Sequence, residues 1–195
     1  IAGSGGMDSS KHWPNGSKTM PTPEHSRKKL PLGIQTFAKL REGNYYYADK
    51  TGIAVNLAEN ASYYFLSRPR RFGKSLFLDT LKELFEGNKS LFEGLQAENR
   101  WNWQEKNSVI RISFSDGVLQ SREQLDDRIQ GILHENRIRL GQKKSVELRE
   151  HDIAGHLRNM IFQAHAQSGQ KVVVLVDEYD KPILDNITNR EIATD

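Results

Sequence analysis

The sequence contains no cysteine, and this absence excludes several kinds of site. Among its 195 residues there is no thiol, so the protein forms neither disulfides nor cysteine-ligated zinc sites. Its six histidines also lack the spacing of a metal site. A reducing compartment suits such a chain, and we therefore expect it in the cytoplasm.

Long apolar runs are missing as well. No run approaches the about 20 residues that a helix needs to cross a bilayer, and no apolar stretch follows the first basic residues as in a signal peptide. We therefore expect no membrane partner. The net charge of +3 permits nucleic acid as a partner without arguing for it, because surfaces of mixed charge are common.

The N-terminal part of the chain has no apolar periodicity. Residues 1–30 are rich in glycine, serine, proline and lysine, and such a segment cannot bury enough surface to offset its ordering entropy. We predict a disordered basic and polar tail there. Residues 1–6 precede Met7 and resemble a non-native vector scar. The cluster Arg27–Lys29 is either a solvated approach to the domain or a nucleic-acid contact.

Beyond the tail, the spacing of apolar residues predicts alternating helices and strands. Helices are expected over 34–41, 51–60, 74–86, 89–95, 121–140 and 153–167. Strands are expected over 45–47, 63–67, 109–114 and 172–176. This alternation predicts an α/β fold with a mainly parallel sheet flanked by helices.

The segment Arg68–Ser75 is typical of a phosphate-binding P-loop. It joins a predicted strand to a helix that begins with Gly-Lys-Ser. Backbone N–H groups at a helix N-terminus have no partner within the helix and face any anion placed there. Lys74 is expected to reach the β- and γ-phosphates, and the Ser75 hydroxyl to ligate Mg²⁺. The predicted nucleotide-binding residues are Arg68, Pro69, Arg70, Arg71, Phe72, Gly73, Lys74, Ser75 and Leu76.

Arg68 departs from the P-loop pattern, which has glycine at this position. Glycine allows a sharp turn with positive φ, which costs arginine about 1–2 kcal/mol, and Pro69 stiffens the same turn. Three readings of Arg68, Arg70 and Arg71 stay open. Their guanidinium groups grip phosphate bidentately, bind an acidic partner, or are simply exposed beside the loop.

A second motif follows the predicted strand 172–176. The apolar run ends in Asp177-Glu178, the Walker B pattern, and ligand sites of parallel sheets lie outside the carboxyl ends of strands. Ser75 and Asp177 are therefore the predicted Mg²⁺ ligands. Glu178 is predicted to activate water, which makes Glu178 and Lys74 the catalytic candidates. The alternative is an ion pair between Lys74 and Asp177 in a site without nucleotide.

Four separated motifs resemble the predicted AAA-ATPase-like family of bacteria. They are Leu32–Ile34, Tyr47–Thr51, Phe65–Leu76 and Val174–Pro182. The resemblance implies an AAA+-like P-loop NTPase fold with ATP and Mg²⁺ as cofactors. It also implies that arginine at the position of Arg68 is typical of the family. Members usually continue into a segment that resembles PD-(D/E)XK nucleases.

The resemblance also implies that the domain over 31–195 is incomplete. In AAA+-type sheets, the strand after the Walker B strand inserts between that strand and the P-loop strand. Only Lys181–Asp195 follow Walker B here, and they are predicted to begin a helix. We therefore expect a fold truncated after the Walker B strand, with a gap or an improvised pairing in its sheet.

Two groups of motif residues have open roles. Asp49 and Lys50 either line the nucleotide pocket or belong to a helix cap with Thr51, and the cap is the favoured reading. Three residues follow the Walker B acid, namely Tyr179, Asp180 and Lys181. They contact nucleotide or a partner, or Asp180 and Lys181 form a local ion pair.

The predicted function is ATP binding with Mg²⁺-dependent hydrolysis, as the motor or switch module of a longer protein. One alternative is a nucleotide-binding or interaction scaffold that does not hydrolyse, since a sensor residue and an arginine finger are absent from the sequence. Another is a nucleic-acid-binding module coupled to a nuclease-like domain that is absent here. The sequence leaves oligomerisation open.

Overall fold

The computed structural model describes residues 28–60, 63–67, 69, 72–117, 121–143 and 152–185. Most of the predicted tail lies outside the described residues, as do Arg68, Arg70, Arg71 and the last ten residues.

A parallel pair of strands lies at the centre of the molecule. Strand β1 (Val109–Ser113) pairs with β2 (Val173–Asp177), in the register that sets Ser113 opposite Asp177. The two strands come from distant parts of the chain and are joined through two long helices, as parallel pairing requires. Over the described residues, the predicted parallel sheet is confirmed as a sheet of two strands.

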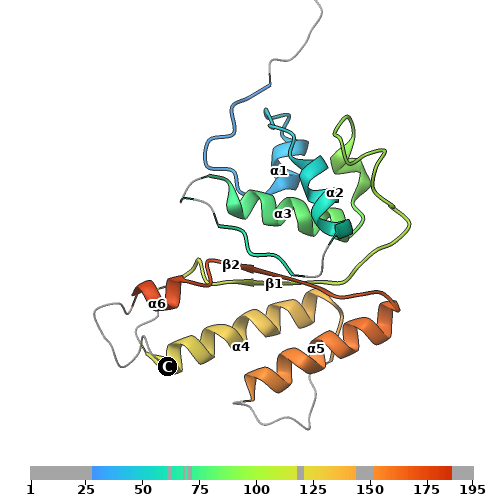
Figure 1. Cartoon of the computed structure of the whole chain (residues 1–195). Helices are drawn as coiled ribbons and strands as arrows, with labels where there is room; N and C mark the ends of the chain where they lie inside the picture. The colour runs from blue at the N-terminus through green and yellow to red at the C-terminus, as the bar shows by residue number, and fades with distance from the viewer. Residues whose placement is uncertain are drawn as a thin grey trace, which may run out of the picture.

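Helices cover both faces of this sheet (Figure 1). One layer holds α1 (Phe37–Glu42), α2 (Thr51–Asn60) and α3 (Lys74–Phe85). The opposite layer holds α4 (Arg122–Arg139) and α5 (Ile153–Ser168), and the short α6 (Lys181–Asp185) follows β2. A 3₁₀ turn, η1 (Lys89–Phe92), stands where a short helix was predicted. The chain is therefore α/β with helices on both sides of its sheet.

Two apolar clusters stabilise the two layers. The first joins the N-terminal helices to α3 around Phe37 and Phe92, whose rings lie 4.9 Å apart. Trp101 and Trp103 pack against this cluster. The second cluster lies under β1 and consists of Ile110, Leu133 and Met160, with partly buried neighbours from α4 and α5.

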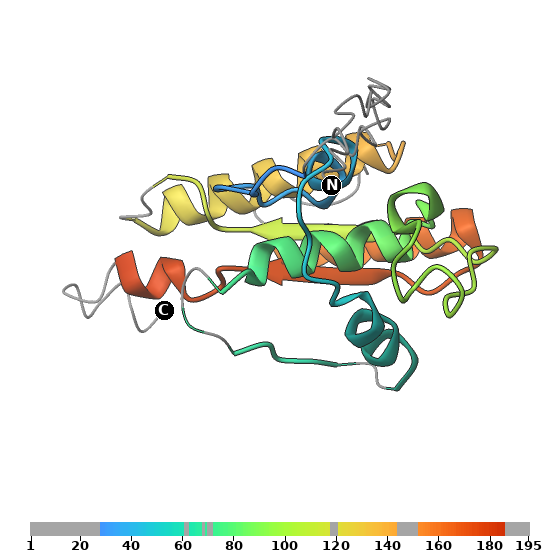
Figure 2. The same ribbon diagram turned by 90° about the horizontal axis from the view of Figure 1, so that it is seen from above.

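Two predicted strands are absent from the described residues. The segment 63–67 is extended but pairs with neither β1 nor β2, and Tyr45 forms only an isolated bridge with Lys29. The reason is physical: apolar sequence makes a strand only where a neighbouring backbone completes the ladder. Segment 63–67 runs alongside β2 on the side away from β1 (Figure 2). The expected gap in the sheet and the truncation both stay predictions.

The two edges of the sheet differ. On the outer edge of β1, Asn136 of α4 accepts from the Arg111 N–H at 2.9 Å and donates to the Arg111 carbonyl at 2.8 Å. Arg139 donates to the Val109 carbonyl and Arg128 to the Ser113 carbonyl. Side chains of α4 thus replace a neighbouring strand, which is one way in which proteins close an edge.

The edge of β2 is open over the described residues. Bonds from Val173 to Ser108 and from Phe114 to Asp177 show which residues pair with β1. Because alternate residues point their backbone groups to opposite sides, those of Val174 and Val176 face away from β1. No hydrogen bond to another described residue satisfies them there.

The ends of the long helices follow their sequence signals. Ser121 caps α4 by accepting from the Gln124 N–H at 3.2 Å, and Asp152 caps α5 by accepting from the Gly155 N–H at 2.8 Å. Gly169 ends α5 with φ of 67°. Within the described part of the chain, no helix is long and apolar enough to cross a membrane.

Candidate phosphate-binding site

Helix α3 begins where the Gly-Lys-Ser sequence predicts it. Gly73 has φ of 73°, a left-handed conformation that glycine adopts without the cost to a side chain. The carbonyl of Gly73 accepts from the Phe77 N–H at 3.0 Å, while no described side chain caps the helix. The first N–H groups of α3 are therefore available to an anion.

The predicted loop residues that are described lie around this helix start. Lys74, Ser75 and Leu76 are half-buried, whereas Pro69 and Phe72 are exposed. The Pro69 carbonyl accepts from the Phe72 N–H at 3.4 Å. Arg68, Arg70 and Arg71 lie outside the described residues, and their predicted contacts stay predictions.

Asp177 ends β2 on the face of the sheet that carries α3. Its register partner Ser113 lies on the same face as Arg111, and Arg111 pairs with Asp79 of α3. The N-terminal end of α3 and the carboxyl end of β2 lie at the same end of the molecule (Figure 2). The fold therefore brings the two predicted halves of the site to one edge.

The environment of the Asp177 carboxylate is unusual for a buried acid. Asp177 is only 5% exposed, and no ion pair or side-chain hydrogen bond joins its carboxylate to another described residue. In particular, no ion pair with Lys74 is present among the described residues. The Asp177 oxygens are not among the buried atoms that lack a hydrogen-bond partner, so water or a bound cation can reach them at the end of the strand.

Glu178 stands at a sharp turn directly after β2. Its φ of 51° lies in the left-handed region, which costs a residue with a side chain roughly 1–2 kcal/mol. The Glu178 carbonyl accepts from the Lys181 N–H at 3.1 Å and closes the turn. The side chain is exposed, so water reaches it freely.

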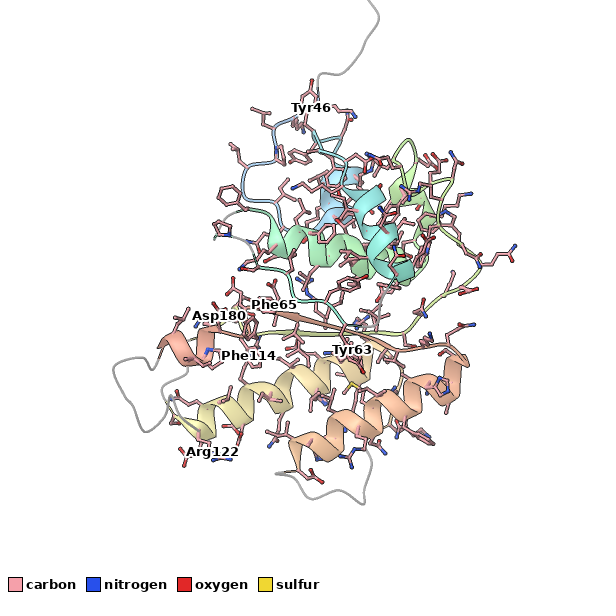
Figure 3. The ribbon with its side chains drawn as sticks, viewed as in Figure 1. Tyr46, Tyr63, Phe65, Phe114, Arg122 and Asp180 are labelled. Carbon is pink, nitrogen blue, oxygen red and sulfur yellow. The ribbon has the colours of Figure 1, made fainter. Side chains whose placement is uncertain are left out.

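Aromatic packing links this turn to the segment that precedes the loop. The ring of Tyr179 meets that of Phe65 edge-on, with centroids 5.7 Å apart. Figure 3 shows Phe65, Phe114 and Asp180 at the same end of the sheet. The segments before the loop, after β1 and after β2 thus converge there.

The residues present suit a magnesium ion better than a transition metal. Over the described residues, no group of three histidine or acidic side chains could hold a metal by itself. Mg²⁺ typically takes one or two protein oxygens and completes its shell with phosphate oxygens and water. The Ser75 hydroxyl and the Asp177 carboxylate are donors of that kind.

The Tyr47–Thr51 motif connects separate segments of the chain. Asp49 accepts from the Thr51 N–H at 2.8 Å and from the Gln96 N–H at 2.8 Å. The first bond satisfies the N–H at the start of α2, so the favoured reading of Asp49 as a cap is confirmed. Burial raises the pKa of Tyr47, although a hydrogen bond with Thr80 of α3 lowers it in part.

One buried connection was not predicted from the sequence. Asp79 of α3 is 3% exposed and accepts from the Phe37 N–H at 2.7 Å and from Arg111 at 2.8 Å. Its carboxylate thereby joins α3 to α1 and to β1. A signal existed, because helical spacing sets Asp79 on the same face as Leu76 and Glu83, among buried positions.

Comparison with known proteins identifies relatives. The family described as Predicted AAA-ATPase matches residues 31–195. A protein of Azotobacter chroococcum mcd 1, named "Uncharacterized protein in vnfD 5'region", is 56% identical over 169 residues. That alignment covers 86% of this chain and 32% of the relative, so the chain spans about a third of the relative's length. No solved structure matches.

Proposed function

Because the chain belongs to the predicted AAA-ATPase family, we propose that it binds ATP at the start of α3 and hydrolyses it with Mg²⁺. In a longer protein, such a module would act as a motor or switch. The proposal includes a P-loop fold, in which β2 is the Walker B strand and segment 63–67 precedes the loop. A location in the cytoplasm belongs to the same proposal.

Each residue has a role that follows from its position. The free N–H groups of α3 and the Lys74 ammonium bind the phosphates. Ser75 and Asp177 would hold Mg²⁺, which neutralises charge that develops on the phosphate oxygens. Glu178 orients a water molecule and takes its proton, so that the water oxygen attacks the γ-phosphorus as the bond to the β-phosphate oxygen breaks.

The observation that carries the proposal is the Asp177 carboxylate, which makes no ion pair or side-chain hydrogen bond with another described residue. It lies at the carboxyl end of a parallel strand, on the face that carries α3. An ion pair between Asp177 and Lys74 would have favoured the alternative reading, a site that binds no nucleotide. No such ion pair is present among the described residues. The geometry therefore supports a site that a cation and an anion complete together.

Phosphate release tests this proposal. Wild-type protein with Mg·ATP is expected to release phosphate, and Glu178→Gln to lower the rate about 100-fold, because a general base contributes roughly that much. Chelation of Mg²⁺ should abolish release. Glu93→Gln is the matched control, because Glu93 is also an exposed glutamate and is not one of the predicted site residues. This variant should keep the wild-type rate. Equal rates for Glu178→Gln and Glu93→Gln would contradict the role of Glu178.

A non-hydrolysing scaffold is the second candidate function. It is favoured by the exposure of Glu178, because hydrolytic sites usually exclude bulk water around the reacting groups. Lys74-dependent binding of ATP without phosphate release would support the scaffold. Nucleic-acid binding has less support, since Arg111, Arg128 and Arg139 each ion-pair with an acidic side chain.

A further inference from the structure

The turn that carries Glu178 is connected to the neighbouring loop by a side chain with no assigned role. Lys181, the first residue of α6, donates from its ammonium to the carbonyl of Gly117 at 2.5 Å. Gly117 belongs to the loop between β1 and α4 and has φ of 78°, a conformation that orients its carbonyl and favours glycine. The contact therefore spans two loops at the carboxyl end of the sheet.

Lys181 also closes the turn through its backbone. Its N–H donates to the Glu178 carbonyl at 3.1 Å, so the main chain of Lys181 fixes the left-handed turn while its side chain holds the next loop. This arrangement differs from the ion pair with Asp180 that the sequence suggested, since no such pair is present between these two described residues.

The opposite side of the turn has its own contact. Tyr179 packs on Phe65, and the backbone bond from Phe114 to Asp177, 3.3 Å long, prolongs the ladder up to the turn. The strained φ of Glu178 persists only where surrounding contacts determine it. One of those contacts is the bond from the charged side chain of Lys181 to the Gly117 carbonyl.

We propose that Lys181 is a positioning residue for Glu178, acting through Gly117 and the turn rather than through nucleotide. The inference rests on the proposed hydrolysis, in which Glu178 takes a proton from water. A general base must stay within hydrogen-bond reach of that proton, and a displacement of about 1 Å costs up to roughly 100-fold in rate. Loss of the bond from Lys181 to Gly117 would release the turn.

The test compares Lys181→Met and Lys181→Arg with Lys171→Met as matched control. Lys171 is an exposed lysine before β2. In Lys181→Met, kcat for phosphate release should fall about 10- to 100-fold, while the Kd of a non-hydrolysable ATP analogue stays within about twofold. Lys181→Arg should recover part of kcat, because a guanidinium also donates to a carbonyl. Lys171→Met should match the wild type.

Amide hydrogen exchange separates this proposal from the proposed hydrolysis. Peptides that cover residues 114–117 should exchange faster in Lys181→Met than in Lys171→Met, whether or not the protein turns over ATP. If the wild type binds ATP but releases no phosphate, hydrolysis fails and the exchange comparison alone decides about Lys181. Unchanged exchange overturns the proposal, and so does a Kd that rises about tenfold or more, because Lys181 would then bind nucleotide directly.

Discussion

Asp49 holds two distant segments together with one carboxylate. Its oxygens accept from the N–H and hydroxyl of Thr51, at 2.8 and 2.6 Å, and from the N–H of Gln96. Burial alone would raise the pKa of Asp49, but the hydrogen bonds outweigh it and lower that pKa below its usual 3.8.

This pKa predicts how stability changes in acid. The folded-state pKa of Asp49 lies below the unfolded value, so its contribution is complete above pH 3.8 and is lost as the pH falls through the folded-state pKa. Asp49→Ala should cost about 1–2 kcal/mol of unfolding free energy near neutral pH. Urea unfolding across the acid range should show this difference shrink below pH 3.8.

Asp116→Ala provides the control for that series. Asp116 pairs with Arg128, but its side chain is 77% exposed, and exposed pairs contribute about 0–1 kcal/mol. A difference between wild type and Asp49→Ala that stays constant down to the lowest pH would contradict the assigned hydrogen bonds.

At the scale of elements, α4 closes the sheet on one side. Asn136 is 5% exposed, and its amide bonds to Arg111 as a neighbouring strand would. It also donates to the Ile132 carbonyl at 2.8 Å. Such a side chain protects backbone groups that would otherwise pair with another chain.

Asn136→Ala should therefore weaken the fold and expose an edge. The Arg111 N–H and carbonyl lose their partners, which costs about 1–3 kcal/mol. Asn159→Ala is the matched control, because Asn159 makes its side-chain bond within α5, to Gln163. Urea unfolding should separate the two variants, and sedimentation at rising concentration should show association of Asn136→Ala alone. Equal unfolding free energies for Asn136→Ala and Asn159→Ala would contradict the assigned role of Asn136 at the sheet edge.

Local patterns predicted helices well and strands only in part. The period of apolar residues located α2 without error, and α4 and α5 to within about two residues, the usual uncertainty of helix ends. The extended segment 63–67 has the right residues for a strand but no ladder partner among the described residues. Edge closure by Asn136 was equally out of reach, because it depends on how α4 packs against β1.

The same division holds for the candidate site. Gly73 and Lys74 at a helix start, and Asp177 at a strand end, follow from sequence spacing alone. The exposure of Glu178 and the bond from Lys181 to Gly117 do not, because both depend on how the turn meets another loop.

For the whole molecule, the asymmetry of the sheet is the main feature. Its outer edge is closed by α4, whereas Val174 and Val176 at the other edge are 39% and 43% exposed. Tyr63 and Phe65, in the extended segment alongside, are 94% and 72% exposed. The chain spans 32% of its relative from Azotobacter chroococcum. Over the described residues, the sheet is closed on one side and open on the other.

The central claim is that the start of α3 binds ATP, and calorimetric titration tests it most directly. Mg·ATP would be titrated into the wild type, Lys74→Ala and the exposed-lysine control Lys171→Ala. The account predicts that Lys74→Ala raises Kd at least about tenfold, or ~1.4 kcal/mol, while Lys171→Ala leaves it unchanged. Equal affinity of the wild type and Lys74→Ala would contradict it.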